Sequence, residues 1–193
     1  MKLLLKFLAL LALLATAGRV LAKEAARTET LFLFQNHRVT ISVPEGYVYS
    51  SGRDERGIIT AKLVAPKQKV ELQVSFQPDP DGRLTTEAGQ MAFLAQVCRP
   101  YVDGSVERSY HFKSLEPHRG SGTYCVFTDA SLVGREPPKG EFLNITASVK
   151  VASGVAIIFT LLSTDTTSND YQTALKLLKE SFESPAPAAS PTT

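Results

Sequence analysis

The sequence predicts an α+β domain, in which a mainly antiparallel sheet of about six to seven strands carries a helix packed on each face. Three observations lead to this fold class. Several short segments alternate apolar and polar residues, two segments place apolar residues at helical spacing, and hairpin-length connections separate most strands. The predicted order is strands, helix, four strands, helix.

Short strands are expected before the first helix. The segment 70–76 is the clearest, because its apolar and polar residues alternate strictly. The turn 78–82 ends it, since Pro, Asp and Gly favour turn geometry. The other strands expected here are 30–34, 38–43, 47–49 and 58–65.

The first helix is expected to begin at Thr85 or Thr86, because either hydroxyl can cap its free N–H groups. Glu87 then lies in the first turn, where the helix dipole favours an acid. Pro100 disfavours helical geometry at the residue before it, so the regular helix should end close to Arg99.

Four strands and a second helix complete the predicted domain. One strand, 141–151, alternates strongly between apolar and polar residues. The segment 155–162 is apolar on both faces, as expected of a central strand that is covered on both sides. The other two strands are 107–115 and 123–132, and the helix is 168–182.

The first 22 residues have the pattern of a cleaved signal peptide: a basic start, a short apolar run and small residues before the expected cut after Ala22. A flexible N-terminus (23–30), the α+β domain (31–183) and a disordered tail rich in Pro, Ala, Ser and Thr (184–193) follow. The product is predicted to be periplasmic or secreted, and the pattern leaves open which of the two.

The sequence argues against nucleic acid as a partner, against a lipid anchor and against membrane insertion. The chain has 21 Lys and Arg against 19 Asp and Glu, and three of the bases lie in the signal, which leaves 18 bases against 19 acids. We therefore expect no nucleic acid as partner. No Cys near the cut offers a lipid anchor, and the apolar run 155–162 is too short for stable membrane insertion.

The two cysteines, Cys98 and Cys125, are predicted to form a disulfide, since an even pair in an exported protein suggests a bridge. The alternative is two free buried thiols that behave as small apolar residues. Cys98 is expected near the end of the first helix, facing the core, and Cys125 on a strand.

The order of elements, together with the segment 41–47 (Ile-Ser-Val-Pro-Glu-Gly-Tyr), resembles the PsbP-like fold. This helix–sheet–helix sandwich occurs in extrinsic photosystem II subunits, in Ran-binding transport factors and in exported bacterial proteins. The resemblance covers about residues 31 to 183, and the exported bacterial members are the most similar. It implies a non-enzymatic role in binding or assembly and transfers no catalytic residue.

No motif predicts catalytic, metal-binding or cofactor-binding residues. The three histidines lack the spacing of a metal site, and Asp79 and Asp81 fit a turn better than a calcium loop. Ser121 lies between two glycines but between strands, unlike a nucleophile elbow. Asn144 begins an N-glycosylation acceptor sequence, although it lies in the middle of a predicted strand. Whether Asn144 is glycosylated depends on the source of the protein. The histidines are His37, His111 and His118.

Three functions remain after this survey. The first is an exported, non-enzymatic binding or accessory protein of the bacterial envelope or secretome, which contacts another exported protein. The second is a periplasmic carrier of a small apolar or aromatic molecule in a cleft between sheet and helix. The third is a secreted hydrolase with an unrecognised site. Partner, ligand and oligomeric state are left open.

Overall fold

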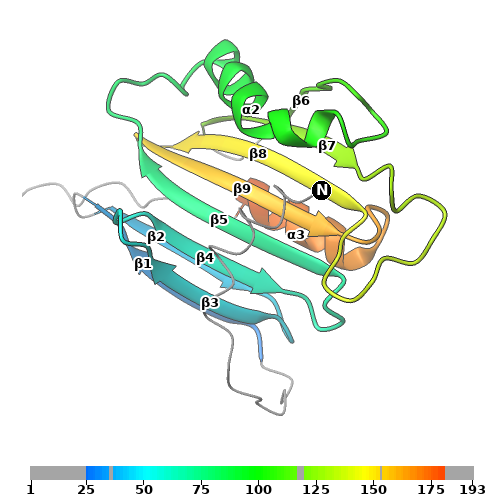
Figure 1. The fold of residues 1–193 in the computed structure, drawn as a ribbon. Helices are drawn as coiled ribbons and strands as arrows, with labels where there is room; N and C mark the ends of the chain where they lie inside the picture. The colour runs from blue at the N-terminus through cyan, green and yellow to red at the C-terminus, as the bar shows by residue number, and fades with distance from the viewer. Residues whose placement is uncertain (1–24, 35–36, 117–119, 153, 181–193) are drawn as a thin grey trace, which may run out of the picture.

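The computed structural model describes residues 25–34, 37–116, 120–152 and 154–180 (Figure 1). Within these ranges nine strands and two helices follow one another. In chain order they are β1 (Arg27–Phe32), β2 (Arg38–Val43), β3 (Val48–Arg53), β4 (Ile59–Val64), β5 (Val70–Pro78), α2 (Glu87–Val102), β6 (Lys113–Ser114), β7 (Ser121–Thr128), β8 (Asn144–Ala152), β9 (Val155–Ser163) and α3 (Asn169–Glu180).

The two predicted end segments, the signal (1–22) and the tail (184–193), lie outside the described residues. The domain limits derived from them stay a prediction. β1 begins at Arg27, so the second half of the segment 23–30 forms a strand rather than a flexible N-terminus. Neither helix in the described ranges has the length and apolar content needed to cross a bilayer.

Seven strands form one antiparallel sheet in the order β3-β4-β5-β9-β8-β7-β6. The strands β1 and β2 pair with each other in a separate two-stranded sheet. β9 lies between β5 and β8 and pairs with both over all nine of its residues. This central position accounts for its apolar residues on both faces, and the α+β class with a mainly antiparallel sheet is confirmed.

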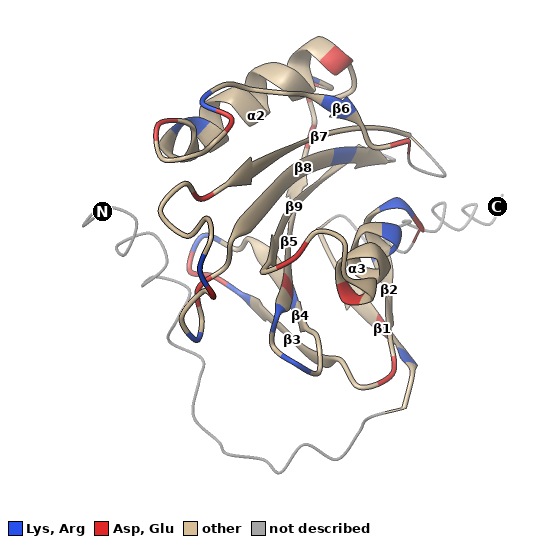
Figure 2. Ribbon diagram, turned by 90° about the vertical axis from the view of Figure 1, so that its right-hand side faces the viewer, with Lys and Arg blue, Asp and Glu red and all other residues tan. Residues whose placement is uncertain are grey.

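The sheet separates α2 from α3 and the β1–β2 hairpin (Figure 2). Side chains from α3, the hairpin and one sheet face form the first core cluster, which includes Ile41, Phe159 and Leu178. On the opposite face, α2 packs on a smaller second core cluster that includes Leu94 and Phe127. The prediction of a helix on each face is confirmed, and the hairpin adds a layer that the sequence did not suggest.

β8 is buried on both faces, although its residues alternate between apolar and polar. Thr146, Ser148 and Lys150 are each 0% exposed. The Thr146 hydroxyl lies 2.9 Å from the Tyr171 hydroxyl of α3, and the Lys150 ammonium donates to the Lys179 carbonyl oxygen at 3.2 Å. The strand alternates like an amphipathic one, but its polar side lies beneath α3, where Thr146 and Lys150 have hydrogen-bond partners.

The first helix begins as predicted and ends later. Thr86 caps α2, because its hydroxyl accepts a hydrogen bond from the Gly89 N–H at 3.1 Å. The helix continues past Pro100 to Val102. Pro100 is exposed while Tyr101 packs on the second core cluster, so packing of the last turn offsets the hydrogen bond that the proline cannot make.

Of the predicted strand 107–115, two residues form a strand in the structure, Lys113 and Ser114 of β6. Upstream of β6, Arg108 has a φ of 49°, in the left-handed region that interrupts a strand. The Glu107 carboxylate accepts hydrogen bonds from the Thr128 N–H and hydroxyl, both at 2.8 Å. Hydrogen bonds to the Glu107 side chain therefore hold this segment, in place of the continuous backbone hydrogen bonding that a strand would make.

Candidate functional site

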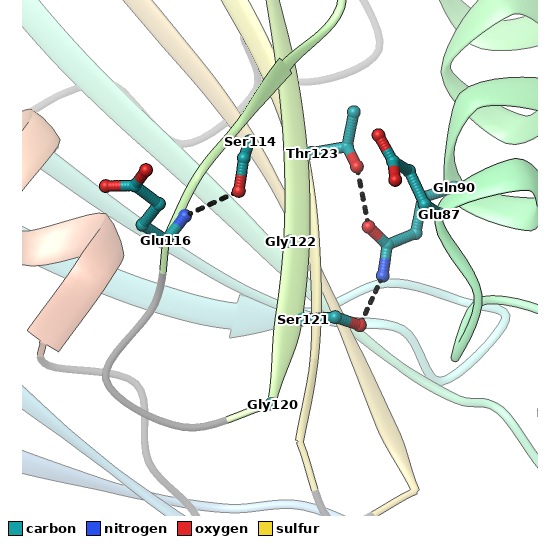
Figure 3. A pocket seen from close by; sticks show the side chains of 8 residues that line it. All are labelled: Glu87, Gln90, Ser114, Glu116, Gly120, Ser121, Gly122 and Thr123. Atoms are coloured by element: carbon teal, nitrogen blue, oxygen red, sulfur yellow. Dashed lines mark hydrogen bonds between the residues drawn. The ribbon is translucent and has the colours of Figure 1, made fainter.

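A pocket of about 280 Å³ lies between the first turn of α2 and the β6–β7 hairpin (Figure 3). It is the cleft between helix and sheet that a small-molecule carrier requires. Its lining combines two carboxylates, an amide, hydroxyls and glycine backbone. The lining residues are Glu87, Gln90, Ser114, Glu116, Gly120, Ser121, Gly122 and Thr123.

Gln90 organises one wall of this pocket. Its side-chain amide donates to the Leu84 carbonyl oxygen at 2.8 Å and to the Ser121 hydroxyl oxygen at 2.7 Å. Its carbonyl oxygen accepts from the Thr123 hydroxyl at 2.7 Å. The residue is 1% exposed, so these bonds are shielded from water and fasten the start of α2 to β7.

Two glycines let the neighbouring backbone come close to β7. At Gly120, where φ is +77°, a Cβ would lie 2.0 Å from the Val151 carbonyl oxygen. At Gly122 a Cβ would meet the Leu115 side chain at 3.0 Å. The Gly-Ser-Gly segment of the sequence is thus explained by close packing.

The pocket can offer hydrogen bonds and negative charge. Ser121 donates to the Thr85 carbonyl oxygen at 3.3 Å and accepts from Gln90, and neither contact is a general base that could activate its hydroxyl. Glu87 and Glu116 are exposed residues at the rim. This lining fits a small polar or cationic molecule better than the apolar or aromatic ligand that the sequence suggested.

The two cysteines lie together in the second core cluster. Cys98 on α2 and Cys125 on β7 are both 0% exposed, and their Sγ atoms are 3.8 Å apart. A hydrogen bond with Cys125, reinforced by burial, raises the pKa of the Cys98 thiol. They are two thiols in contact, so the predicted disulfide stays a prediction, although the structure brings its partners together.

The predicted turn at Asp79 and Asp81 is present directly before α2, and His111 lies outside β6 rather than on the predicted strand. Asp79 accepts a hydrogen bond from the Leu84 N–H at 3.1 Å, which stabilises the turn before α2, and Asp81 pairs with Arg83 at 3.2 Å. His111 is exposed and lies 3.0 Å from the Ser109 hydroxyl. His118 lies outside the described residues, among which no three His, Cys, Asp or Glu side chains group to hold a metal.

On the side of the sheet that carries α2, one half of the sheet has no helix over it within the described ranges. α2 packs on β7, β8 and Ile158 of β9, and no helix of the described ranges lies over β4 and β5 on that side (Figure 1). We call this half the uncovered sheet surface and define it by the side chains that alternate with buried apolar residues. These are Thr60, Lys62, Glu71, Gln73 and Ser75.

The charges on the uncovered sheet surface are already paired. The Lys62 ammonium lies 2.7 Å from a Glu71 carboxylate oxygen, and the Gln73 amide donates to the other carboxylate oxygen at 2.6 Å. The alternating pattern of β5 predicts which of its residues are polar, but it does not predict that they form an uncovered surface. The sequence feature that points to this surface is the set of polar residues on the neighbouring strands β4 and β5. Only the position of α2 in the structure shows that these residues stay uncovered.

Comparison with known proteins shows no family for this chain. No family model and no curated protein matches the chain. Among solved structures, the solution structure of cyanobacterial PsbP (CyanoP) from Synechocystis sp. PCC 6803 is similar, with 14% identity and a TM-score of 0.49. The match covers 84% of this chain and 94% of that one. The likeness to the PsbP-like fold is weak and lies in the topology alone.

Proposed function

We propose that this chain is an exported accessory protein of the bacterial envelope or secretome, without catalytic activity, that acts by contact with another exported protein. The uncovered sheet surface carries this proposal. The opposite face of β4 and β5 is covered by the β1–β2 hairpin and α3, whereas this surface keeps polar side chains without a helix over them. A partner that docks there completes the second layer of the sandwich.

The chemistry of the surface defines the partner. Lys62 and Glu71 neutralise each other, so the surface presents hydroxyl and amide groups with no net charge. Polyanions such as nucleic acid or anionic lipid bind through unpaired basic side chains, which this surface lacks. An uncharged, hydrogen-bonding protein surface fits best, as in the polar interfaces of non-obligate complexes.

Site-specific photocross-linking tests the proposal. A benzophenone amino acid replaces Gln73 on the uncovered sheet surface and, as a matched control, the exposed Gln172 on α3. Irradiation of the source cells should give one protein adduct from position 73 and none from position 172. Excess purified wild-type protein should suppress the adduct, whereas a Thr60→Arg, Ser75→Arg variant should not, because two long charged side chains on this surface would block close approach of the partner.

Three outcomes count against the proposal. They are the absence of an adduct at position 73, the same adduct at position 172, and equal competition by the doubly substituted variant. Circular dichroism of that variant shows whether it folds. Export is checked in the same cells, because cleavage after Ala22 gives a mature protein that begins at Lys23.

A second candidate function, a periplasmic small-molecule carrier, is favoured by the pocket between α2 and β7. Its polar lining selects a small polar or cationic ligand. Native mass spectrometry of freshly purified protein should show a bound mass that is lost in a Ser114→Trp variant, since the indole fills the cavity from an exposed position. Finding only the mass of the free protein would remove this candidate.

A further inference from the structure

The region where α2 meets β7 contains both cysteines of the chain, and it connects segments far apart in the sequence. Cys98 and Cys125 are 27 residues apart, and each belongs to the second core cluster. Gln90, Leu94 and Cys98 form the buried face of α2. The helix is therefore held to β7 at two places, by the Gln90 hydrogen bonds at its start and by the sulfur pair near its end.

The sulfur atoms are positioned for a bond. Their separation of 3.8 Å is close to van der Waals contact, and a disulfide of about 2.05 Å requires only that side-chain rotation and a small shift of α2 bring them nearer. Within the described part of the chain, each thiol has the other thiol as its hydrogen-bond partner, and the cluster around them is otherwise apolar and aromatic. A bond here would join α2 to the sheet on the face where, within the described ranges, α2 is the helix that covers it.

The folded dithiol is closed to oxidants. Thiol oxidation requires a thiolate that an oxidant can reach. Both residues are 0% exposed, so an oxidant cannot reach either sulfur in the folded state. In a chain on which α2 has not yet packed, both side chains are in water and an oxidant can reach them.

We propose that Cys98 and Cys125 form an intramolecular disulfide during folding in the export compartment, before α2 packs on β7. One S–S bond forms and two S–H bonds break. The two thiols lose two protons and two electrons, and a disulfide oxidant of the compartment takes them up and becomes a dithiol. Packing of α2 then buries the bond and protects it from reductants. This inference rests on the export part of the proposed function and is independent of the partner contact.

Thiol counting on exported protein tests whether the bond forms. Under denaturing conditions, a maleimide mass tag should add no label before reduction and two labels after it. The Cys98→Ser and Cys125→Ser variants should each show one reactive thiol without reduction, as matched controls. Two reactive thiols in unreduced exported wild-type protein would overturn the proposal.

A kinetic experiment tests the order of events. Fully reduced protein, refolded without oxidant, is exposed to oxidised glutathione either folded or in urea, and the free thiols are counted over time. The unfolded protein should oxidise at least about 100-fold faster, because only it exposes thiolates. Equal rates in the two states would overturn the proposed order.

A third measurement separates failure of this proposal from failure of export. If the signal peptide is not cleaved in the source cells, the export proposal fails. Refolding of the purified protein with oxidised glutathione still tests whether Cys98 and Cys125 form a disulfide. The oxidised product should unfold at higher urea concentration than the reduced one. A mixture dominated by intermolecular disulfides, or an oxidised monomer that unfolds at lower urea concentration, would count against the Cys98–Cys125 bond.

Discussion

Gly89 and Gln90 are adjacent in the first turn of α2, and both act through close contact. Gly89 allows the Arg83 carbonyl oxygen to approach its Cα, and Gln90 satisfies buried groups from the preceding turn and from β7. The cap at Thr86 could be predicted from sequence, because capping depends on neighbouring residues. The partners of Gln90 on β7 could not, because they lie 31 and 33 residues away.

Replacing Gly89 by alanine should destabilise the protein. A Cβ at this position would lie 1.9 Å from the Arg83 carbonyl oxygen, so the turn before α2 must move. We expect the free energy of unfolding, measured in urea, to fall by about 1–3 kcal/mol despite the better helix propensity of alanine.

The matched control is Gly104→Ala, where a Cβ would meet no atom within 4 Å. Its free energy of unfolding should stay within about 0.5 kcal/mol of the wild type. An equal fall in the free energy of unfolding for both variants would show that the close contact at Gly89 is not the cause of the destabilisation.

Tyr47 should make stability depend on alkaline pH. Its hydroxyl donates to the Asp170 carbonyl oxygen at 3.2 Å, and burial, with the nearby Asp170 charge, raises its pKa from 10.0 to about 12. Between these values the folded state binds more protons than the unfolded state, so stability falls as pH rises. Its contribution is complete below pH 10 and is lost as pH rises through about 12.

Comparison of wild type with Tyr47→Phe isolates this contribution from the other tyrosines. The variant should be less stable by about 1 kcal/mol at pH 8, because one hydrogen bond is lost. The difference between the urea unfolding midpoints of the wild type and the variant should be smaller at pH 11 than at pH 8. A difference that is constant from pH 8 to pH 11 would contradict the assignment.

At the level of elements, strands with a regular pattern were predicted better than segments held by side chains. β5 and β9 follow their apolar patterns, because hydrophobic spacing is a local property of the chain. The strand expected at 107–115 fails, because Glu107 bonds to Thr128, which is distant in sequence. β8 has an amphipathic pattern and is buried on both faces, because α3 returns to cover it.

Substitution of Pro100 should stabilise α2. The residue lies inside the helix, is exposed, and has no N–H for the carbonyl one turn earlier. We expect Pro100→Ala to raise the free energy of unfolding by about 1–3 kcal/mol, measured in urea. The neighbouring exposed Arg99→Ala serves as the control and should change it little. An unchanged or lower stability of Pro100→Ala would mean that the helix end is fixed by packing alone.

At the level of the whole molecule, the layers are unequal. One face of the sheet carries α3 and the β1–β2 hairpin over the first core cluster, and the other carries α2 over the smaller second cluster. The hairpin is a separate sheet, so side-chain packing, rather than strand pairing, attaches it to the seven-stranded sheet. The pocket and the uncovered sheet surface both lie on the less covered side.

Ile41 tests whether the hairpin is part of the cooperative fold. It is 0% exposed in the first core cluster, and its neighbour Ser42 is exposed. Ile41→Ala should lower the free energy of unfolding by about 2–5 kcal/mol, and Ser42→Ala should change it by about 0.5 kcal/mol at most. Similar small changes for both would indicate that the hairpin unfolds separately from the sheet.

The sequence by itself determined the α+β class, the sheet and helix segments with regular periodicity, and the caps and turns, because these depend on residues close together in the chain. Only the tertiary structure decided which faces are covered. It placed Cys98 beside Cys125, Gln90 against β7, α3 over the polar side of β8, and, within the described ranges, no helix over β4 and β5 on the side of α2. Burial depends on where distant segments pack, and local periodicity carries no information about that.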